Sequence, residues 1–345
     1  MSLARLPRAS ALALLATLAL AACASGEATT AADAADAAAT TESAAQETTT
    51  EAADTAETTE TAAEVTVATA TGDVTVPTNP TRVVVFEHAI LDTLDTLGLG
   101  DAVVVIPHHA MPGYLEPYTE TTTNGGTLFE PDYEAINAAE PDLIIVGGRS
   151  AETLPEMEKI APAIDLSFDR GTDAFLASLD RNVATVGAIF DVAEEADAAL
   201  AAIEEEAAAI KADAADAGTG LVLLTTGGKV SAYGAAEDGR FDFFYTWLGV
   251  EPATDQIAID THGDAVSYEY IAEVDPDMIV VLDRDAAIGR EGDSAQVLMD
   301  NALVNGTSAG QTGAIAFVDT PSWYLSFGGL TALDTVLDEV AELVG

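Results

Sequence analysis

Cysteine and basic residues are scarce in this chain, and their scarcity excludes several classes of protein. Cys23 is the only cysteine among the 345 residues, so neither a disulfide within the chain nor a cysteine-based metal site is possible. The chain has 12 Lys and Arg residues against 59 Asp and Glu residues, which gives a formal net charge of −47 at pH 7. A chain this acidic repels phosphate backbones, and we expect no nucleic-acid partner.

Histidines and enzyme motifs are also few. The segment Gly306–Gly310 matches the pattern G-x-S-x-G, but a predicted helix precedes it and a predicted strand follows, the reverse of a nucleophile elbow. Gly227-Gly228-Lys229 lacks the spaced first glycine of a phosphate-binding loop. The sequence therefore offers no credible nucleophile, and we expect that the protein is not an enzyme. The four histidines are His88, His108, His109 and His262.

The first 64 residues are predicted to lie outside the folded part. Residues 1–22 have a basic start and an apolar run too short to span a bilayer comfortably, which is typical of a secretory signal. The run ends in Leu-Ala-Ala-Cys, which resembles the bacterial lipobox and predicts lipidation of Cys23; a plain signal peptide cut elsewhere is the alternative. Residues 23–64 are almost wholly Ala, Thr, Glu, Asp and Ser, so they are predicted to form a disordered acidic tether.

An internal repeat organises the rest of the chain. The segment EAINAAEPDLIIVGGR (134–149) aligns without a gap with EYIAEVDPDMIVVLDR (269–284), with seven of sixteen positions identical. Each copy predicts a short helix that ends before Pro, then a strand buried on both faces, then an Arg at the carboxyl end of that strand. Because ligands bind outside the carboxyl ends of parallel strands, we expect Arg149 and Arg284 to face one cleft. The alternative is that both form surface ion pairs.

The repeat and the alternation of strands and helices predict an α/β fold with two Rossmann-like lobes. The first lobe is expected over residues 65–171, starting with a β-hairpin, and the second over 192–345. Apolar residues at helical spacing predict one long interdomain helix over 172–191. In the second lobe, further helices are expected over 295–304 and 330–344.

His262 and Tyr324 are candidate metal ligands. His262 lies in the turn-like segment Asp260–Gly263, and Tyr324 follows the last predicted strand. A phenolate oxygen suits a hard, highly charged ion, and imidazole suits iron among other metals. Nearby arginines would hold an anionic chelate rather than a bare ion. The alternatives are an incidental loop histidine and a tyrosine that only packs in the core.

Six ordered segments between Val74 and Val344 resemble the ferric-siderophore substrate-binding proteins of bacterial ABC transporters, especially the lipoproteins that bind catecholates. The segments are VPTNPTRVVVFEHAILDTLDTLG, EPDLIIVGGR, SAYG followed by Arg240-Phe241, DTHG, VLDR with DNALV, and SWYLSFGGL. The resemblance implies two lobes joined by one long helix. It also implies that Arg149, Arg240 and Arg284 contact catecholate oxygens while His262 and Tyr324 coordinate the iron.

The same resemblance implies how the protein would work. Fe(III) would be bound as a siderophore complex, with no intrinsic cofactor, and delivered to an ABC permease. The protein would be a monomer anchored through Cys23 to the outer face of the cell membrane. Other cargo stays open: a hydroxamate siderophore, haem, cobalamin, or a divalent metal held by His88, His108 and His262. An enzyme acting on a catecholate ester, or a metal-dependent oxidoreductase, is the third hypothesis.

Overall fold

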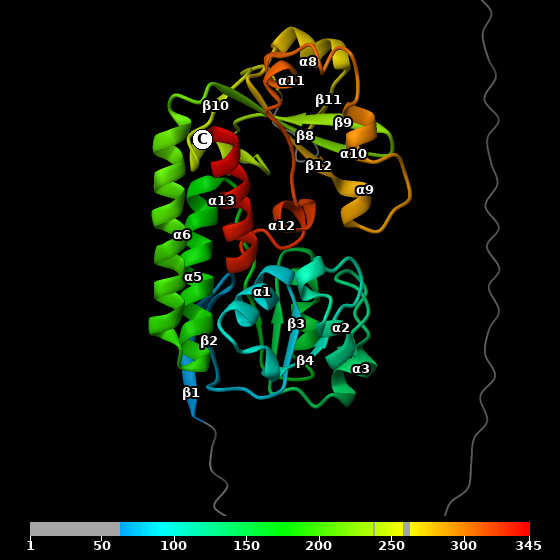
Figure 1. Cartoon of the computed structure of the whole chain (residues 1–345). Helices are drawn as coiled ribbons and strands as arrows, with labels where there is room; N and C mark the ends of the chain where they lie inside the picture. Colours follow the sequence, from blue (N-terminus) through cyan, green and yellow to red (C-terminus); the bar gives the residue numbers. More distant parts are fainter. Residues whose placement is uncertain (1–62, 237–238, 258–262) are drawn as a thin grey trace, which may run out of the picture. The chain divides into compact units, whose positions relative to one another are not determined.

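The computed structural model describes residues 63–236, 239–257 and 263–345 (Figure 1). The predicted signal peptide, Cys23, nearly all of the predicted tether and His262 lie outside these residues. Within the described ranges, no helix is both long enough and apolar enough to cross a membrane. The first two strands, β1 (Glu64–Thr69) and β2 (Gly72–Pro77), form an antiparallel hairpin, as the sequence predicts.

The first lobe is built on a parallel sheet with the strand order β5-β4-β3-β6-β7. Every residue of the two central strands, β3 and β6, is buried, which explains their unbroken apolar sequences. The strands are β3 (Val83–Phe86), β4 (Val103–Ile106), β5 (Thr123–Asn124), β6 (Leu143–Val146) and β7 (Ala163–Asp165). The helices of this lobe are α1 (His88–Thr96), η1 (Gly100–Ala102), η2 (Gly113–Leu115), α2 (Tyr118–Thr121), α3 (Tyr133–Ala138), η3 (Gly148–Thr153) and α4 (Leu154–Met157).

The second lobe contains a mixed sheet with the order β11-β9-β8-β12-β13, and β10 pairs with the end of β8. Its strands are β8 (Thr219–Thr226), β9 (Lys229–Tyr233), β10 (Glu251–Pro252), β11 (Asp264–Ala265), β12 (Met278–Asp283) and β13 (Ile315–Phe317). The antiparallel strand β9 is absent from the sequence prediction. Gly227 and Gly228 form the turn before it, with φ of 55° and 72°, values that glycine adopts without a steric cost.

One predicted helix of the second lobe is shorter than expected. The helix predicted over 295–304 ends as α10 (Ala295–Met299), because Asn301 follows and its side-chain oxygen accepts the backbone N–H of Leu303 at 2.8 Å. Such local side-chain bonds compete with helix formation. The other helices of this lobe are α7 (Asp242–Thr246), α8 (Tyr268–Val274), α9 (Arg284–Ala287), α11 (Ser308–Thr312) and α12 (Thr320–Tyr324).

The long helix α5 (Thr172–Phe190) joins the two lobes, as predicted. Its first half places Phe175, Leu179 and Val183 in the core of the second lobe. Its second half places Val186 and Ile189 in the core of the first lobe. The helices α6 (Ala193–Ala214) and α13 (Leu330–Val344) pack together, and α6 also packs along α5 (Figure 1). The residue limits predicted for the lobes stay predictions.

A buried carboxylate also ties the two lobes together. Asp92 on α1 is fully buried, and its carboxylate oxygens accept the first backbone N–H groups of α13, from Thr331 at 2.8 Å and Ala332 at 2.9 Å. Tyr114 donates its hydroxyl to the same carboxylate at 2.6 Å. The first lobe therefore caps a helix that packs in the core of the second lobe.

Candidate functional site

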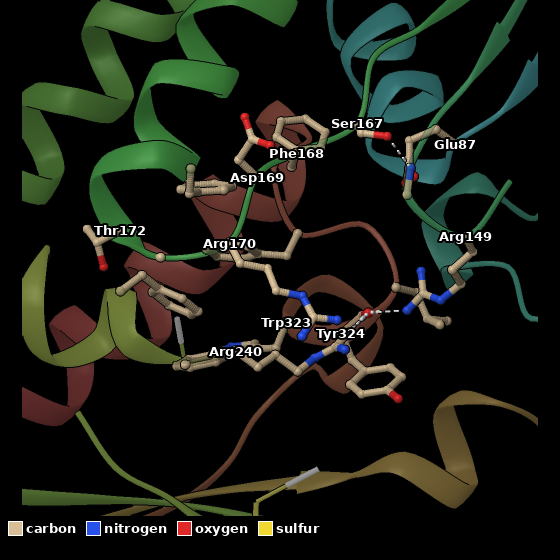
Figure 2. Close-up of a pocket in the computed structure, with 17 residues that line it drawn as sticks. Glu87, Arg149, Ser167, Phe168, Asp169, Arg170, Thr172, Arg240, Trp323 and Tyr324 are labelled. Atoms are coloured by element: carbon tan, nitrogen blue, oxygen red, sulfur yellow. Dashed lines mark hydrogen bonds between the residues drawn. The ribbon is translucent and has the colours of Figure 1, made fainter. Parts of the chain in front are cut away.

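The three arginines that the sequence singles out meet at one tyrosine. Arg149 and Arg240 donate to the backbone carbonyl oxygen of Tyr324 at 2.9 and 2.8 Å (Figure 2). Arg284 donates through Nε to the Tyr324 hydroxyl at 2.9 Å. The Arg240 guanidinium also lies over the Tyr324 ring, with its central carbon 3.8 Å from the ring centroid. The structure thus brings four of the predicted site residues together.

The repeat explains how two of these arginines arrive there. Arg149 follows the buried strand β6, and Arg284 follows β12 at the equivalent position, so both leave the carboxyl ends of central strands. Arg240 comes from the loop before α7. Among the described residues, none of the three has a carboxylate within ion-pair distance, so the alternative of surface ion pairs does not apply to them.

Tyr324 is held in place by its neighbours on α12. Asp319 caps this helix by accepting the backbone N–H of Ser322 at 3.0 Å. Trp323 is buried and donates its indole N–H to Glu339 of α13 at 2.7 Å, while the other oxygen of Glu339 accepts the backbone N–H of Asp319 at 2.7 Å. The orientation of Tyr324 is therefore fixed by α13 before any ligand arrives.

The surroundings of Tyr324 favour its phenolate form. Burial by itself would raise the pKa of the phenol, but the positive charges of Arg240, Arg284 and Arg149 and the hydrogen bond from Arg284 outweigh burial. The net result is a pKa below the ordinary value of 10.0. A tyrosine that loses its proton more readily is a better ligand for a hard metal ion.

Burial makes the charged form of Arg240 less favourable. Burial lowers its pKa to about 10, with repulsion from Arg149 and Arg170 adding to the effect and attraction to Tyr324 opposing it. Its Nε has no hydrogen-bond partner in the part of the chain that the structure describes. A buried donor without an acceptor is costly, so an anionic ligand that supplied one would be favoured.

Arg149, Arg240 and Tyr324 border a cavity of about 550 Å³ between the lobes (Figure 2). One wall is aromatic: Phe327 stacks on Phe175 and on Phe243, with ring centroids 4.8 and 4.1 Å apart. Phe168 and Trp323 extend this wall. Aromatic residues make up only 6% of the sequence and come here from three separate stretches, 168–175, 243 and 323–327, so no local pattern predicts their meeting.

A fourth arginine, Arg170, also lines the cavity and was missed by the sequence interpretation (Figure 2). Two signals could have found it. Arginine is rare in this chain, and Arg170 stands directly before the glycine that begins the interdomain helix. Ten Lys and Arg residues lie beyond residue 64, and four of them gather at this site, which makes it a cationic centre in an acidic protein.

Glu87, at the start of α1, also lines the cavity. Its side chain is buried against Gly147 and Gly148. Burial raises its pKa, and the opposing attraction of Arg149 is the smaller effect. The charged form of Glu87 is therefore less favourable here than in water.

The described histidines do not form a metal site with other His, Cys, Asp or Glu side chains of the described residues. His262 lies outside the described residues, so its role as an iron ligand stays a prediction. His88 is buried, burial lowers its pKa to about 3, and neither ring nitrogen has a hydrogen-bond partner among the described residues. His108 contacts Thr122 at 3.2 Å. Across the described ranges, no three His, Cys, Asp or Glu side chains gather as a metal site would require.

Comparisons with known proteins identify the family of this chain. A family model described as a periplasmic binding protein matches residues 83–321. The petrobactin-binding protein YclQ of Bacillus subtilis is 38% identical over 269 residues, which span 77% of this chain and 83% of that protein. The ferric-anguibactin-binding protein FatB of Vibrio anguillarum is 29% identical over 277 residues, covering 78% of this chain and 84% of FatB.

Two solved structures of related binding proteins superpose on this chain. The crystal structure of YclQ superposes with a TM-score of 0.76 at 36% identity, over 82% of this chain and 99% of that one. The periplasmic catecholate-siderophore binding protein VctP of Vibrio cholerae superposes with a TM-score of 0.73 at 28% identity, over 81% of this chain and 100% of that one. The predicted architecture of two α/β lobes and a long helix is confirmed.

Proposed function

Since the chain belongs to the periplasmic binding protein family, we propose that it captures ferric catecholate siderophores in the interlobe cavity and delivers them to an ABC permease. Membership in a family of binding proteins also means that the protein is not an enzyme, as the sequence predicts. Iron then enters as cargo, already wrapped by its chelator, and no intrinsic cofactor is involved.

The observation that carries this proposal is the convergence of Arg149, Arg240 and Arg284 on Tyr324. Ferric catecholate complexes are anions with oxygen donors at their surface, and guanidinium groups match such oxygens in charge and geometry. Each charge-assisted hydrogen bond contributes about 1.5–3 kcal/mol. Carboxylates elsewhere on this acidic chain are screened beyond roughly 8 Å at physiological ionic strength, so the local cations decide the outcome.

Tyr324 and His262 are proposed to complete the iron coordination. A chelator with two catecholates supplies four oxygens and leaves two octahedral positions open, which one phenolate and one imidazole would fill. The lowered pKa of Tyr324 supports the first of these ligands. A direct bond to iron would require the hydroxyl of Tyr324 to keep a lone pair free beside the hydrogen bond from Arg284, and a phenolate oxygen has room for both.

The relatives support a catecholate cargo over the alternatives. The name of YclQ gives petrobactin as its ligand, and the name of VctP gives a catecholate siderophore. A hydroxamate complex, cobalamin or a bare divalent cation would leave the cluster of arginines without anions to bind. The bare-cation hypothesis also relied on His88 and His108. His88 is buried at the start of α1, whereas His108 lies beside a different hollow, which Met111 and Ile288 also line.

The remaining parts of the proposal concern the cell surface. We propose that residues 1–22 export the chain, that Cys23 anchors it by lipid to the outer face of the cell membrane, and that residues 23–64 act as the tether. The protein would work as a monomer beside its permease. A radiolabelled or mass-shifted Cys23 peptide that disappears in a Cys23→Ala variant would test the anchor.

A ligand titration tests the function itself. The purified protein is titrated with a ferric bis-catecholate, a ferric tris-catecholate and a ferric hydroxamate, with tryptophan fluorescence and visible spectra recorded together. Trp323 adjoins Tyr324, so bound iron complexes should quench it. We expect tight binding of the bis-catecholate with a shifted charge-transfer band. Binding of the hydroxamate alone, or of none of the three, would contradict the proposed function.

A matched pair of tyrosine variants sharpens this test. Tyr324→Phe should weaken binding of the bis-catecholate by at least about tenfold, or ~1.4 kcal/mol, and should remove the spectral shift. Tyr133→Phe, at an exposed position in the first lobe, is the control and should bind as the parent does. Unchanged affinity in Tyr324→Phe would refute direct coordination and leave chelate binding intact.

A further inference from the structure

The guanidinium of Arg284 is held at two points, and only one of them belongs to the site described above. Its Nε donates to the Tyr324 hydroxyl at 2.9 Å, and its Nη1 donates to the Thr226 hydroxyl at 3.3 Å. Thr226 is the last residue of β8, which pairs with β12, so the second contact joins the guanidinium to the carboxyl end of the neighbouring strand. Because a guanidinium is planar, two contacts on different nitrogens fix the direction of its plane.

The Thr226 hydroxyl is itself oriented by a buried carboxylate. Asp285 follows Arg284 in the chain and is buried, and its Oδ1 accepts the hydroxyl proton of Thr226 at 2.9 Å. The other oxygen of Asp285 accepts the backbone N–H of Gly227, in the turn between β8 and β9. A hydroxyl has a single proton, and since the carboxylate takes it, the lone pairs of Thr226 are left for Arg284. The three side chains therefore form one chain of hydrogen bonds, from Arg284 through Thr226 to Asp285.

The internal repeat shows which part of this arrangement the two lobes share. Ser150 occupies the place of Asp285 in the first copy and is also buried. Its hydroxyl donates to the carbonyl oxygen of Phe86, the last residue of β3, at 2.8 Å. Among the described residues, the Arg149 guanidinium has no hydrogen bond besides the one to the Tyr324 carbonyl. A tie to the neighbouring strand is therefore common to both lobes, and its extension to the guanidinium belongs to the second lobe.

The backbone of Arg284 is fixed as well. Asp283 caps α9 by accepting the backbone N–H of Ala286 at 3.0 Å, and it also accepts the backbone N–H of Ala295 at 2.8 Å. The remaining freedom of Arg284 thus lies in the torsions of its long side chain. The hydrogen bond to Thr226 restricts these torsions before any ligand arrives.

From this geometry we infer that Thr226 and Asp285 are positioning residues, which act through Arg284 by holding its guanidinium in the orientation that binds a ferric catecholate. The inference rests on the proposed function, in which Arg284 contacts the catecholate oxygens. Ordering a long side chain at the moment of binding weakens affinity, and a side chain that is already ordered avoids this loss. Removal of either positioning residue should therefore lower affinity about threefold to tenfold while Arg284 is still present.

Titration of a ferric bis-catecholate into the parent protein and three variants tests the role of Thr226. Thr226→Val removes the hydroxyl and keeps the shape of the side chain, whereas Thr226→Ser keeps the hydroxyl. The matched control is Thr225→Val on the same strand, because the Thr225 hydroxyl donates to the Leu282 carbonyl at 3.2 Å. We expect Thr226→Val to bind about threefold to tenfold more weakly. Thr226→Ser and Thr225→Val should stay within about twofold of the parent.

Asp285→Asn tests the second step of the chain of hydrogen bonds. An amide has one accepting oxygen, so it serves either the Gly227 N–H or the Thr226 hydroxyl, and not both. We expect the same loss of about threefold to tenfold in affinity. An affinity within about twofold of the parent would remove Asp285 from the positioning role.

A double-mutant cycle separates positioning from a general structural effect. Arg284→Gln should itself bind at least about tenfold more weakly. In that background Thr226→Val should cause less than about twofold further loss, because the guanidinium that Thr226 positions is absent. Additive losses, or an unchanged affinity of Thr226→Val, would overturn the positioning role and leave the proposed function standing. A parent protein that binds no ferric catecholate would overturn both.

Discussion

Replacing Asp92 by Asn probes the contact that ties the lobes together. Each carboxylate oxygen of Asp92 accepts one backbone N–H of α13 and one hydroxyl. Oδ1 accepts from Thr331 at 2.8 Å and from Thr96 at 3.2 Å, and Oδ2 accepts from Ala332 at 2.9 Å and from Tyr114 at 2.6 Å. An amide of the same shape has only one accepting atom, so whichever way it turns, one backbone N–H of α13 faces an NH₂ group.

The expected cost follows from this geometry. A hydroxyl can rotate and accept a hydrogen bond from the new amide, but a backbone N–H cannot. One buried donor thus loses its acceptor, at a cost of about 1–3 kcal/mol. Burial raises the pKa of Asp92, so the charge of this carboxyl adds little to the cost. We expect Asp92→Asn to lower the free energy of unfolding by about 1–3 kcal/mol.

Thermal and urea unfolding of the purified protein measure this cost. For a chain of this size, a loss of about 2 kcal/mol corresponds to a midpoint lower by roughly 4 °C. The control is Asp95→Asn, on the same helix but exposed, where the carboxylate accepts the Tyr118 hydroxyl at 2.7 Å and no other hydrogen bond from the described residues. It should cost about 1 kcal/mol or less. Equal stability of the two variants would refute the argument that Asp92 caps α13 across the lobes.

Two further predictions concern Tyr324 and its support. In an alkaline titration followed by tyrosinate absorbance, the tyrosine that ionises at the lowest pH in the parent should be absent in Tyr324→Phe, because the pKa of Tyr324 is lowered whereas burial raises the pKa of Tyr114, Tyr118 and Tyr245. The pKa of Tyr324 is lower in the folded protein than in the unfolded chain, where it is near 10. Tyr324 therefore stabilises the fold above about pH 10, and this contribution is lost as the pH falls through the folded pKa. Siderophore affinity should also fall on acidification, because a protonated phenol is a poorer metal ligand. Glu339→Ala should lower the free energy of unfolding by about 2–4 kcal/mol and shift the fluorescence emission of Trp323. The reason is that the indole N–H of Trp323 and the backbone N–H of Asp319 both lose their acceptor. Glu342→Ala, at an exposed position of the same helix, should change neither quantity. Unaltered emission in Glu339→Ala would contradict the proposed support of α12.

Most of the correct predictions of the fold and the site came from the internal repeat and from local sequence patterns. Its buried strands, the arginines that follow them and the long helix α5 depend on local patterns: apolar runs, a proline that stops a helix, and helical spacing. These patterns place Arg149 and Arg284 at equivalent sheet ends, and a cleft follows from α/β topology. The convergence on Tyr324 could be expected only in outline, because the acceptor shared by Arg149 and Arg240 is a backbone carbonyl, which any residue possesses.

Other features of the structure depend on tertiary packing, and the local sequence contains little indication of them. The aromatic wall joins Phe175 from α5, Phe243 from α7 and Phe327 from the segment before α13, which lie far apart in the sequence. Strand β9 was missed because Gly227-Gly228 was considered only as a phosphate-binding motif, although two adjacent glycines between apolar segments also indicate a hairpin turn. The short form of α10 follows from one side-chain bond of Asn301, which competes with a pattern that otherwise favours helix.

The carbonyl oxygen of Tyr324 is one atom that both lobes share. It accepts a hydrogen bond from Arg149 of the first lobe at 2.9 Å and from Arg240 of the second lobe at 2.8 Å. A movement of the two lobes away from each other would therefore stretch the hydrogen bond from Arg149, and its loss would cost about 1.5–3 kcal/mol.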